Sequence, residues 1–188
     1  MSVETAARLC EGGVMPDFTF DTPFAAGLSL SEAVQKTPKT ALLFLRYYGC
    51  TLCQYEMHLL AENYDQITAA GGQVLVVLQS DPAGIAEQIG PDSLPFTIIC
   101  DPQAVLYEKF GIQPAASMAK MADAGTMLKI AKATAAGYKH GAYEGNELQL
   151  PAAFVVDKER RRYPGCPLAG GTVKMTFSPI VPYLHGTL

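Results

Sequence analysis

The sequence has little charge of either sign and no long uninterrupted hydrophobic run. Its 188 residues include 14 Lys and Arg against 18 Asp and Glu, which gives a formal net charge of −4. Nucleic-acid-binding proteins usually concentrate a basic excess on one face, and a membrane-spanning helix needs about 20 predominantly apolar residues. Apolar runs such as residues 41–45 and 74–78 have the length of strands. We therefore expect neither a nucleic-acid partner nor a membrane-embedded protein.

A secretory signal is also missing. The first residues, Met1-Ser2-Val3-Glu4-Thr5, show no basic region followed by an apolar core, so we expect a cytoplasmic protein. The hydrophobic fraction of 49% is typical of a globular chain with enough apolar material for one core. The expected organisation is one domain over residues 1–188, with its core in 15–163.

Cysteines are few and scattered. There are five, an odd number, so they do not form a disulfide framework. Cys50 and Cys53 form the only close pair, which in a reducing compartment is more often catalytic or metal-binding than structural. Two alternatives are ordinary core cysteines and a zinc site, but structural zinc usually needs a second such pair or a Cys/His partner. We expect no metal and no other cofactor.

Strand-like and helix-like segments alternate along the chain. Buried strands are expected at 40–47, 73–79, 96–100 and 152–157, because these segments are rich in Val, Leu, Ile and Phe. A helix is expected over 51–70, with Leu52, Tyr55, Leu59 and Ile67 on its apolar face and Glu56 on its surface. Asp81-Pro82 and Asp101-Pro102 each predict the start of a further helix. This alternation predicts an α/β fold with parallel strands.

Two segments depart from the alternation. Residues 114–150 are rich in Ala, Met, Lys and Gly and predict a helical insertion before the strand at 152. The tail, residues 164–188, contains Pro164, Pro167, Pro179 and Pro182, which make a long helix there unfavourable. Such a tail could bury its apolar residues against another subunit, so a homodimer is one possibility.

The position of the cysteine pair explains its expected chemistry. Cys50 follows a predicted strand and begins a predicted helix, where free N–H groups and the helix dipole stabilise a thiolate. Its pKa should therefore fall below the value of about 8.5 for a free thiol. Cys53 lies one turn further on the same side and can close a disulfide with Cys50. Arg46, four residues before Cys50, would favour the thiolate if its side chain points that way.

The quoted residues resemble a known family. Over about residues 15–163 the chain resembles the peroxiredoxin-like branch of the alkyl hydroperoxide reductase and thiol-specific antioxidant family, within the thioredoxin superfamily. The segments that carry this resemblance are Met15-Pro16-Asp17-Phe18 and residues 43–53, 96–111 and 140–151. It implies a thioredoxin-like fold with a central mixed sheet flanked by helices, in which Pro151 would be a cis-proline opposite the cysteine pair.

The chain departs from this family at the peroxide-binding positions. True peroxiredoxins carry a Pro-x-x-x-Thr-x-x-Cys sequence, but here Arg46 and Cys50 occupy the Pro and Thr positions if Cys53 is the peroxidatic residue. If Cys50 is peroxidatic instead, Leu43 and Tyr47 occupy them. Pro151 stands where the family has a later arginine. The site therefore resembles a thioredoxin dithiol more than a peroxide pocket.

The sequence predicts an antioxidant thiol oxidoreductase. Cys50 would attack a peroxide or a disulfide, Cys53 would resolve the product, and a thioredoxin-like or glutathione system would reset the pair. Candidate substrate-binding residues are Arg46, Thr51, Pro151 and His140, whose imidazole could shuttle protons. The alternative is a redox-sensing or scaffold protein that keeps the fold but has little turnover.

Overall fold

The structure is a computed structural model that describes residues 13–121 and 124–162. The tail at 164–188 and two of the cysteines, Cys10 and Cys166, lie outside the described residues. In chain order the elements are β1 (Thr19–Phe20), β2 (Leu28–Ser29), α1 (Leu30–Ala33), η1 (Val34–Lys36), β3 (Lys39–Phe44), α2 (Thr51–Glu62), α3 (Tyr64–Ala69), β4 (Gly72–Leu78), α4 (Pro82–Ala86), β5 (Thr97–Cys100), α5 (Val105–Lys109), α6 (Met118–Met121), α7 (Ala124–Ala135) and β6 (Ala152–Val156).

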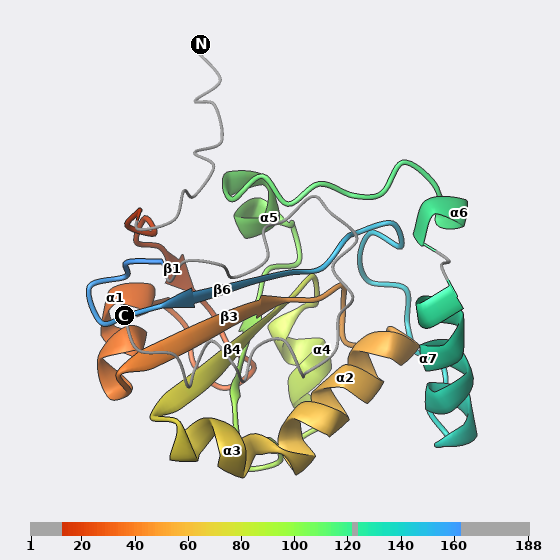
Figure 1. Ribbon diagram of the computed structural model, residues 1–188, viewed down its shortest axis with the longest axis horizontal. Helices are drawn as coiled ribbons and strands as arrows, with labels where there is room; N and C mark the ends of the chain where they lie inside the picture. The colour runs from red at the N-terminus through yellow and green to blue at the C-terminus, as the bar shows by residue number, and fades with distance from the viewer. Residues whose placement is uncertain (1–12, 122–123, 163–188) are drawn as a thin grey trace.

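A four-stranded mixed sheet forms the centre of the molecule. Its strand order is β5-β4-β3-β6, with β3, β4 and β5 parallel and β6 antiparallel to β3. Figure 1 shows the sheet across the middle of the molecule, with α5 above it and α2 and α3 below. The predicted α/β, thioredoxin-like fold with a mixed sheet flanked by helices is confirmed.

Both faces of the sheet are covered, which explains the continuous apolar runs of its strands. Because side chains alternate along a strand, Leu43 and Val76 belong to one buried cluster, with residues of α2, α3 and α4. Phe44 and Val77 belong to a second cluster, with residues of α1, α5 and the segment that leads into β1. The molecule thus has three layers, and α2 begins at the edge where the parallel strands end.

Asp81-Pro82 starts a helix as predicted, but Asp101-Pro102 does not. The Asp81 carboxylate accepts the N–H groups of Ala83 and Gly84 at the start of α4, with Pro82 in the first turn. Asp101 acts from further away, because α5 begins after Ala104 rather than at Pro102. Its carboxylate accepts the N–H groups of Val105 and Leu106 at 2.9 and 2.8 Å.

The expected single helix over 51–70 is two helices. Asn63 interrupts it with φ −109° and ψ 13°, and its side-chain amide donates to the Leu59 carbonyl at 2.8 Å. Asparagine competes for backbone groups in this way and favours helix ends. The prediction of one continuous helix is therefore wrong at Asn63, where α2 ends and α3 follows.

The predicted apolar face of α2 is also wrong. The residues buried on α2 are Cys53, Glu56, Met57 and Leu60, while Leu52, Tyr55 and Leu59 are only partly buried. Glu56, expected on the surface, is buried beneath α7, where its carboxylate lies 2.5 Å from Lys129 Nζ. Lys129 belongs to the insertion, and the spacing of apolar residues in α2 contains no information about this partner.

The predicted helical insertion is confirmed as α6 and α7, and α7 packs against α2 beside the end of the sheet (Figure 1). The expected cis-proline is wrong, because the peptide bond before Pro151 is trans. Pro151 immediately precedes β6, and the start of a strand tolerates an ordinary trans-proline without losing a ladder hydrogen bond. No helix in the described part of the chain is long and apolar enough to cross a membrane.

Candidate active site

The turn between β3 and α2 holds the first cysteine at the start of the helix. Cys50 is the N-cap of α2 with extended backbone angles, and its N–H donates to the Tyr47 carbonyl at 3.2 Å. The Cys50 sulfur accepts the N–H of Cys53 at 3.4 Å. The predicted position at the helix N-terminus is confirmed. Both cysteines are free thiols, and only 1% of Cys50 and 4% of Cys53 is exposed.

The surroundings of Cys50 favour its thiolate. The hydrogen bond from the Cys53 side chain lowers the pKa of Cys50 from 9.0 to about 6, although burial acts in the opposite direction. The positive charge of Arg46 and the N–H groups of Cys53 and Leu52 add to the lowering. Cys50 is therefore mostly ionised at neutral pH, the state in which a cysteine is a nucleophile.

Cys53 is held in the opposite state. Burial raises the pKa of Cys53 well above 9.0, and so does its role as hydrogen-bond donor to the negative Cys50. The Arg46 N–H donates to the Cys53 sulfur at 3.4 Å, which offsets only part of this rise. The two sulfurs thus divide the roles of nucleophile and protonated second thiol.

Arg46 points toward the cysteine pair. Its side chain hydrogen-bonds Cys50, and the charges of both sulfurs and of Glu147 raise the pKa of Arg46 although burial lowers it. Its Nη1 also donates to the Glu147 carbonyl at 2.7 Å and lies 3.9 Å from the Glu147 carboxylate. The guanidinium therefore connects the dithiol to the loop at 138–150, which follows α7.

This 138–150 loop lies directly on the cysteine turn. The Gly141 N–H donates to the Gly49 carbonyl at 2.7 Å. The amide of Gln54 donates to Gly49 and to the Lys139 carbonyl, both at 3.1 Å. A Cβ atom on Gly49 would lie 2.4 Å from the Ala142 carbonyl oxygen, so only glycine permits this approach of two backbones.

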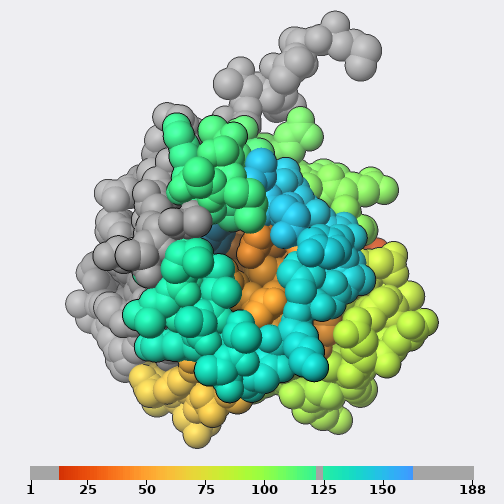
Figure 2. All heavy atoms as spheres, turned by 90° about the vertical axis from the view of Figure 1, so that its right-hand side faces the viewer, coloured from red at the N-terminus to blue at the C-terminus, as the bar shows by residue number. Residues whose placement is uncertain are grey.

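The residues that follow β4 hold the same loop in place through hydrogen bonds. The Asn146 N–H donates to the Gln79 side chain at 2.8 Å. Ser80 donates its hydroxyl to the Glu144 carboxylate at 2.5 Å and accepts the Tyr48 N–H at 2.8 Å. Figure 2 shows the resulting face, in which an orange part of the chain lies in a hollow bordered by the insertion and the 138–150 loop.

His140 reaches the site through a tyrosine. Its Nε2 lies 2.8 Å from the Tyr47 hydroxyl, and its Nδ1 lies 2.9 Å from the Gly141 carbonyl oxygen. Its ring stacks on Tyr143 with centroids 4.1 Å apart. Tyr47 is completely buried in the cluster that contains both cysteines.

The other two predicted residues lie at the same edge of the sheet. Thr51 is the first residue of α2 and is half-buried. Pro151 is followed by Ala152, which pairs with Phe44 near the end of β3. Cys100 ends β5 as a buried thiol, and burial raises its pKa to about 12, which makes it unreactive at neutral pH.

Sequence reasoning missed Tyr47, Gln54 and Glu147 as parts of the site. Gly49 and Gly141 were the available signal for the contact between the cysteine turn and the 138–150 loop, because a close approach of two backbones requires glycine. Among the described residues no group of three or more His, Cys, Asp or Glu side chains could hold a metal ion.

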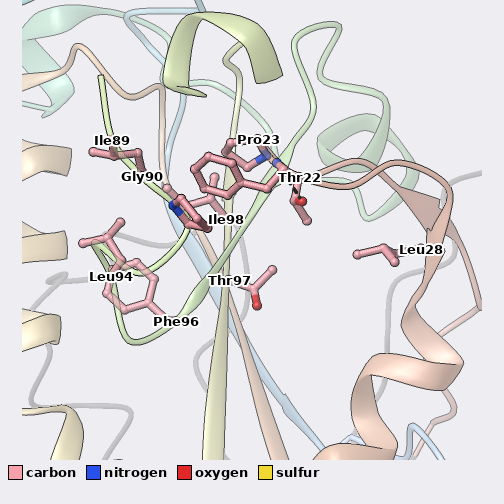
Figure 3. A pocket seen from close by; sticks show the side chains of 11 residues that line it. Thr22, Pro23, Leu28, Ile89, Gly90, Leu94, Phe96, Thr97 and Ile98 are labelled. Atoms are coloured by element: carbon pink, nitrogen blue, oxygen red, sulfur yellow. Dashed lines mark hydrogen bonds between the residues drawn. The ribbon is translucent and has the colours of Figure 1, made fainter. Parts of the chain in front are cut away.

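A cavity of about 180 Å³, lined by both polar and apolar atoms, lies elsewhere (Figure 3). It is lined by Thr22, Pro23, Phe24 and Leu28 on one side and by residues within 89–98 on the other. None of these residues belongs to the cysteine turn or to the 138–150 loop. The cavity is therefore separate from the dithiol.

Comparisons with known proteins agree with this arrangement. The model of the AhpC/TSA family matches residues 12–161. Peroxidoxin BcpB of Mycobacterium tuberculosis is similar in structure with a TM-score of 0.64 at 12% identity, covering 93% of this chain and 95% of that one. The 2-Cys peroxiredoxin of Plasmodium vivax gives a TM-score of 0.63 at 12% identity, covering 93% and 79%.

A third similar structure is a provisionally assigned thiol:disulfide interchange protein, DsbE, from Chlorobium tepidum. It gives a TM-score of 0.56 at 15% identity and covers 94% of this chain and 99% of that one. At such low identities the likeness concerns the fold. No curated protein sequence matches the chain significantly.

Proposed function

Since the chain belongs to the AhpC/TSA family, we propose that it is a thiol peroxidase that works through a Cys50–Cys53 dithiol–disulfide cycle. The observation that carries the proposal is that the pKa values of the two thiols are shifted in opposite directions. Cys50 has a pKa lowered to about 6, and Cys53 remains protonated beside it. A nucleophile and a resolving thiol need this division.

The cycle has three steps. The Cys50 thiolate attacks the terminal oxygen of a hydroperoxide, the O–O bond breaks, and Cys50 becomes a sulfenic acid while an alkoxide leaves and is protonated. Cys53 then gives up its proton and attacks the Cys50 sulfur, which releases water and forms a disulfide. An external thiol reductant, such as a thioredoxin-like protein or glutathione, returns two electrons. A cytoplasmic location would supply that reductant.

Burial of the pair supports a small oxidant. With 1% of Cys50 exposed and the 138–150 loop hydrogen-bonded over it, a hydroperoxide fits the closed site better than a folded protein does. Arg46 has the charge to stabilise the developing alkoxide. It could take the role of the arginine that the family carries at the Pro151 position.

Disulfide exchange is the second candidate. Cys50 and Arg46 occupy positions where a peroxiredoxin has Thr and Pro if Cys53 is peroxidatic, and a Cys-x-x-Cys pair at a helix start suits dithiol exchange. The same sulfurs would act in the same order, with a thiolate leaving in place of an alkoxide.

Steady-state assays with hydrogen peroxide, an organic hydroperoxide and a small disulfide test these candidates. We expect turnover of the peroxides, its loss in Cys50→Ser, and accumulation of an unresolved product in Cys53→Ser. Cys100→Ser is the matched control and should retain full turnover. Turnover of the disulfide alone would favour the second candidate, and negligible turnover with every substrate would leave a redox sensor or scaffold.

A further inference from the structure

The hydrogen bonds of His140 define which of its nitrogens carries a proton. The Gly141 carbonyl oxygen can only accept, so the Nδ1 atom at 2.9 Å must donate to it. In the neutral ring Nε2 is then an acceptor, and it receives the Tyr47 hydroxyl proton at 2.8 Å. His140 and Tyr47 therefore form an ordered donor–acceptor pair.

This pair lies beside the dithiol. The Glu147 carboxylate oxygen that is 3.9 Å from His140 Nε2 is also 3.9 Å from Nη1 of Arg46, whose side chain hydrogen-bonds Cys50. The His140 side chain is 30% exposed, whereas Tyr47 is completely buried in the same apolar cluster as Cys50 and Cys53. The Tyr47 carbonyl also accepts the Cys50 N–H. The Tyr47 hydroxyl thus lies between the partly exposed imidazole and the buried cluster that contains the two cysteines.

The proposed peroxidase cycle requires a proton from outside. Thiolate, thiol, hydroperoxide and one added proton give a disulfide, an alcohol and water. Cys53 supplies one of the two protons needed for the products, and solvent must supply the other. Because both cysteines are almost completely buried, that proton needs a route through the protein.

We propose that His140, acting through the Tyr47 hydroxyl, delivers this proton to the alkoxide that leaves when Cys50 attacks the peroxide. The imidazolium donates Nε2–H to the Tyr47 oxygen while Tyr47 gives its own proton to the alkoxide. Afterwards Tyr47 again donates to a neutral Nε2, the arrangement that the hydrogen bonds describe. This inference rests on the proposed function and deepens it.

The groups that face His140 are suited to this role. The Glu147 carboxylate lies 3.9 Å from Nε2 and can pair with the imidazolium. Tyr143 stacks on the ring from the solvent side, and Arg46 lies beyond Glu147 at 3.9 Å from the same carboxylate oxygen. His140 thus has one negative and two uncharged neighbours, with the cation further away.

The test compares two reactions of the same thiolate. Alkylation of Cys50 by iodoacetamide needs no added proton, whereas peroxide reduction does. In His140→Gln, which can still hydrogen-bond Tyr47 but cannot titrate, we expect peroxide reduction to slow by about 100-fold, a typical loss for a general acid. The rate of peroxide reduction by the wild-type protein should decline at alkaline pH, and this decline should be absent in the variant. The rate of Cys50 alkylation in the variant should stay within twofold of the wild-type rate.

Tyr47→Phe, which keeps the buried ring, should give the same selective loss. His58→Gln on α2 is the matched control, because His58 pairs with exposed Glu62, and it should leave both reactions unchanged. In His140→Ala, added imidazole should restore part of the peroxide rate.

Equal slowing of alkylation and peroxide reduction in His140→Gln would show a role in folding the site and overturn the proposal. A wild-type rate and pH profile in that variant would also overturn it. Failure of the proposed function itself is distinguishable, because the wild-type protein would then lack peroxide turnover while Cys50 still reacted with iodoacetamide.

Discussion

Two cysteines three residues apart have opposite acid–base properties in this molecule. Cys50 is the N-cap of α2 and accepts hydrogen bonds from Cys53, so its pKa falls to about 6, while burial raises that of Cys53. The difference arises mainly from the hydrogen bond that the Cys53 side chain donates to Cys50 and from the burial of Cys53. The first-turn N–H groups, which point at the N-cap, add to the lowering at Cys50. Single-residue changes should therefore affect the two thiols differently.

The lowered pKa predicts how Cys50 reactivity depends on pH. A depressed thiol pKa means that the thiolate is present above about pH 6 and is lost by protonation below it. The rate of Cys50 alkylation, followed by peptide mapping so that other cysteines do not contribute, should rise with a midpoint near 6. Arg46→Met removes a charge that lowers the pKa, so its midpoint should move up toward 9.0.

Arg161→Met is the control, because Arg161 is exposed and forms a bridge with Val14 after the turn that follows β6. Its midpoint should remain near 6. A midpoint near 9 in the wild-type protein, or an unchanged midpoint in Arg46→Met, would contradict this electrostatic account.

The position of the cysteine pair at a helix N-terminus could be predicted from the sequence, because it depends on neighbouring residues. Cys50 and Cys53 are three residues apart, and the strand before them predicted a helix N-terminus at Cys50. Tyr47 and Glu147 could not be found this way, because their partners lie 93 and 101 residues away along the chain. Only the folded 138–150 loop brings these residues together.

At the scale of elements, the 138–150 loop depends on glycine at its contact with the cysteine turn. Gly49→Ala would place a methyl group 2.4 Å from the Ala142 carbonyl oxygen, so the two backbones must separate. We expect a loss of about 1–3 kcal/mol in the free energy of unfolding, as for other overpacked sites. Urea denaturation measures this change.

Gly90→Ala is the matched control, because its nearest neighbour is a serine hydroxyl 3.7 Å from the added methyl group. Its stability should stay close to that of the wild-type protein. A Gly49→Ala variant as stable as Gly90→Ala would mean that the loop does not lie as closely on the turn as described.

The insertion is fastened to α2 by a buried ion pair. Lys129 on α7 lies 2.5 Å from Glu56, whose side chain is only 8% exposed. Lys129→Met should cost about 1–3 kcal/mol of unfolding free energy, because it removes a charged partner from a buried carboxylate. The double variant Glu56→Gln/Lys129→Met should recover part of that loss.

Glu62→Gln, which breaks the exposed His58–Glu62 pair, should change stability by less than about 0.5 kcal/mol. If the Lys129 and Glu62 variants lose the same stability, then the buried pair contributes no more than a surface one.

The elements themselves were predictable to different degrees. Strands β3, β4 and β6 follow from uninterrupted apolar runs that only a sheet covered on both faces can bury. The break at Asn63 depends on a competing side-chain hydrogen bond, and the buried face of α2 depends on its angle to the sheet and on Lys129. The cis-proline expected at Pro151 came from family likeness, and the chain itself has a trans bond.

At the scale of the whole molecule, three layers bring the reactive parts to one edge of the sheet. The parallel strands β3 and β4 both end there, so the cysteine turn, Gln79 and Ser80 share that edge with the 138–150 loop. Membership of the AhpC/TSA family connects this architecture with thiol-dependent oxidoreduction. At the dithiol the sequence departs from the Pro-x-x-x-Thr-x-x-Cys pattern of peroxiredoxins.

The central claim is that Cys50 reacts first and Cys53 resolves it. Its most direct test is to mix reduced protein with one equivalent of hydrogen peroxide, block free thiols with an alkylating reagent, and map the cysteines by mass spectrometry. We predict an intramolecular Cys50–Cys53 disulfide in the wild-type protein and a Cys50 sulfenic acid in Cys53→Ser. Oxidation of Cys53 while Cys50 remains a free thiol, or a disulfide that excludes either residue, would contradict the account.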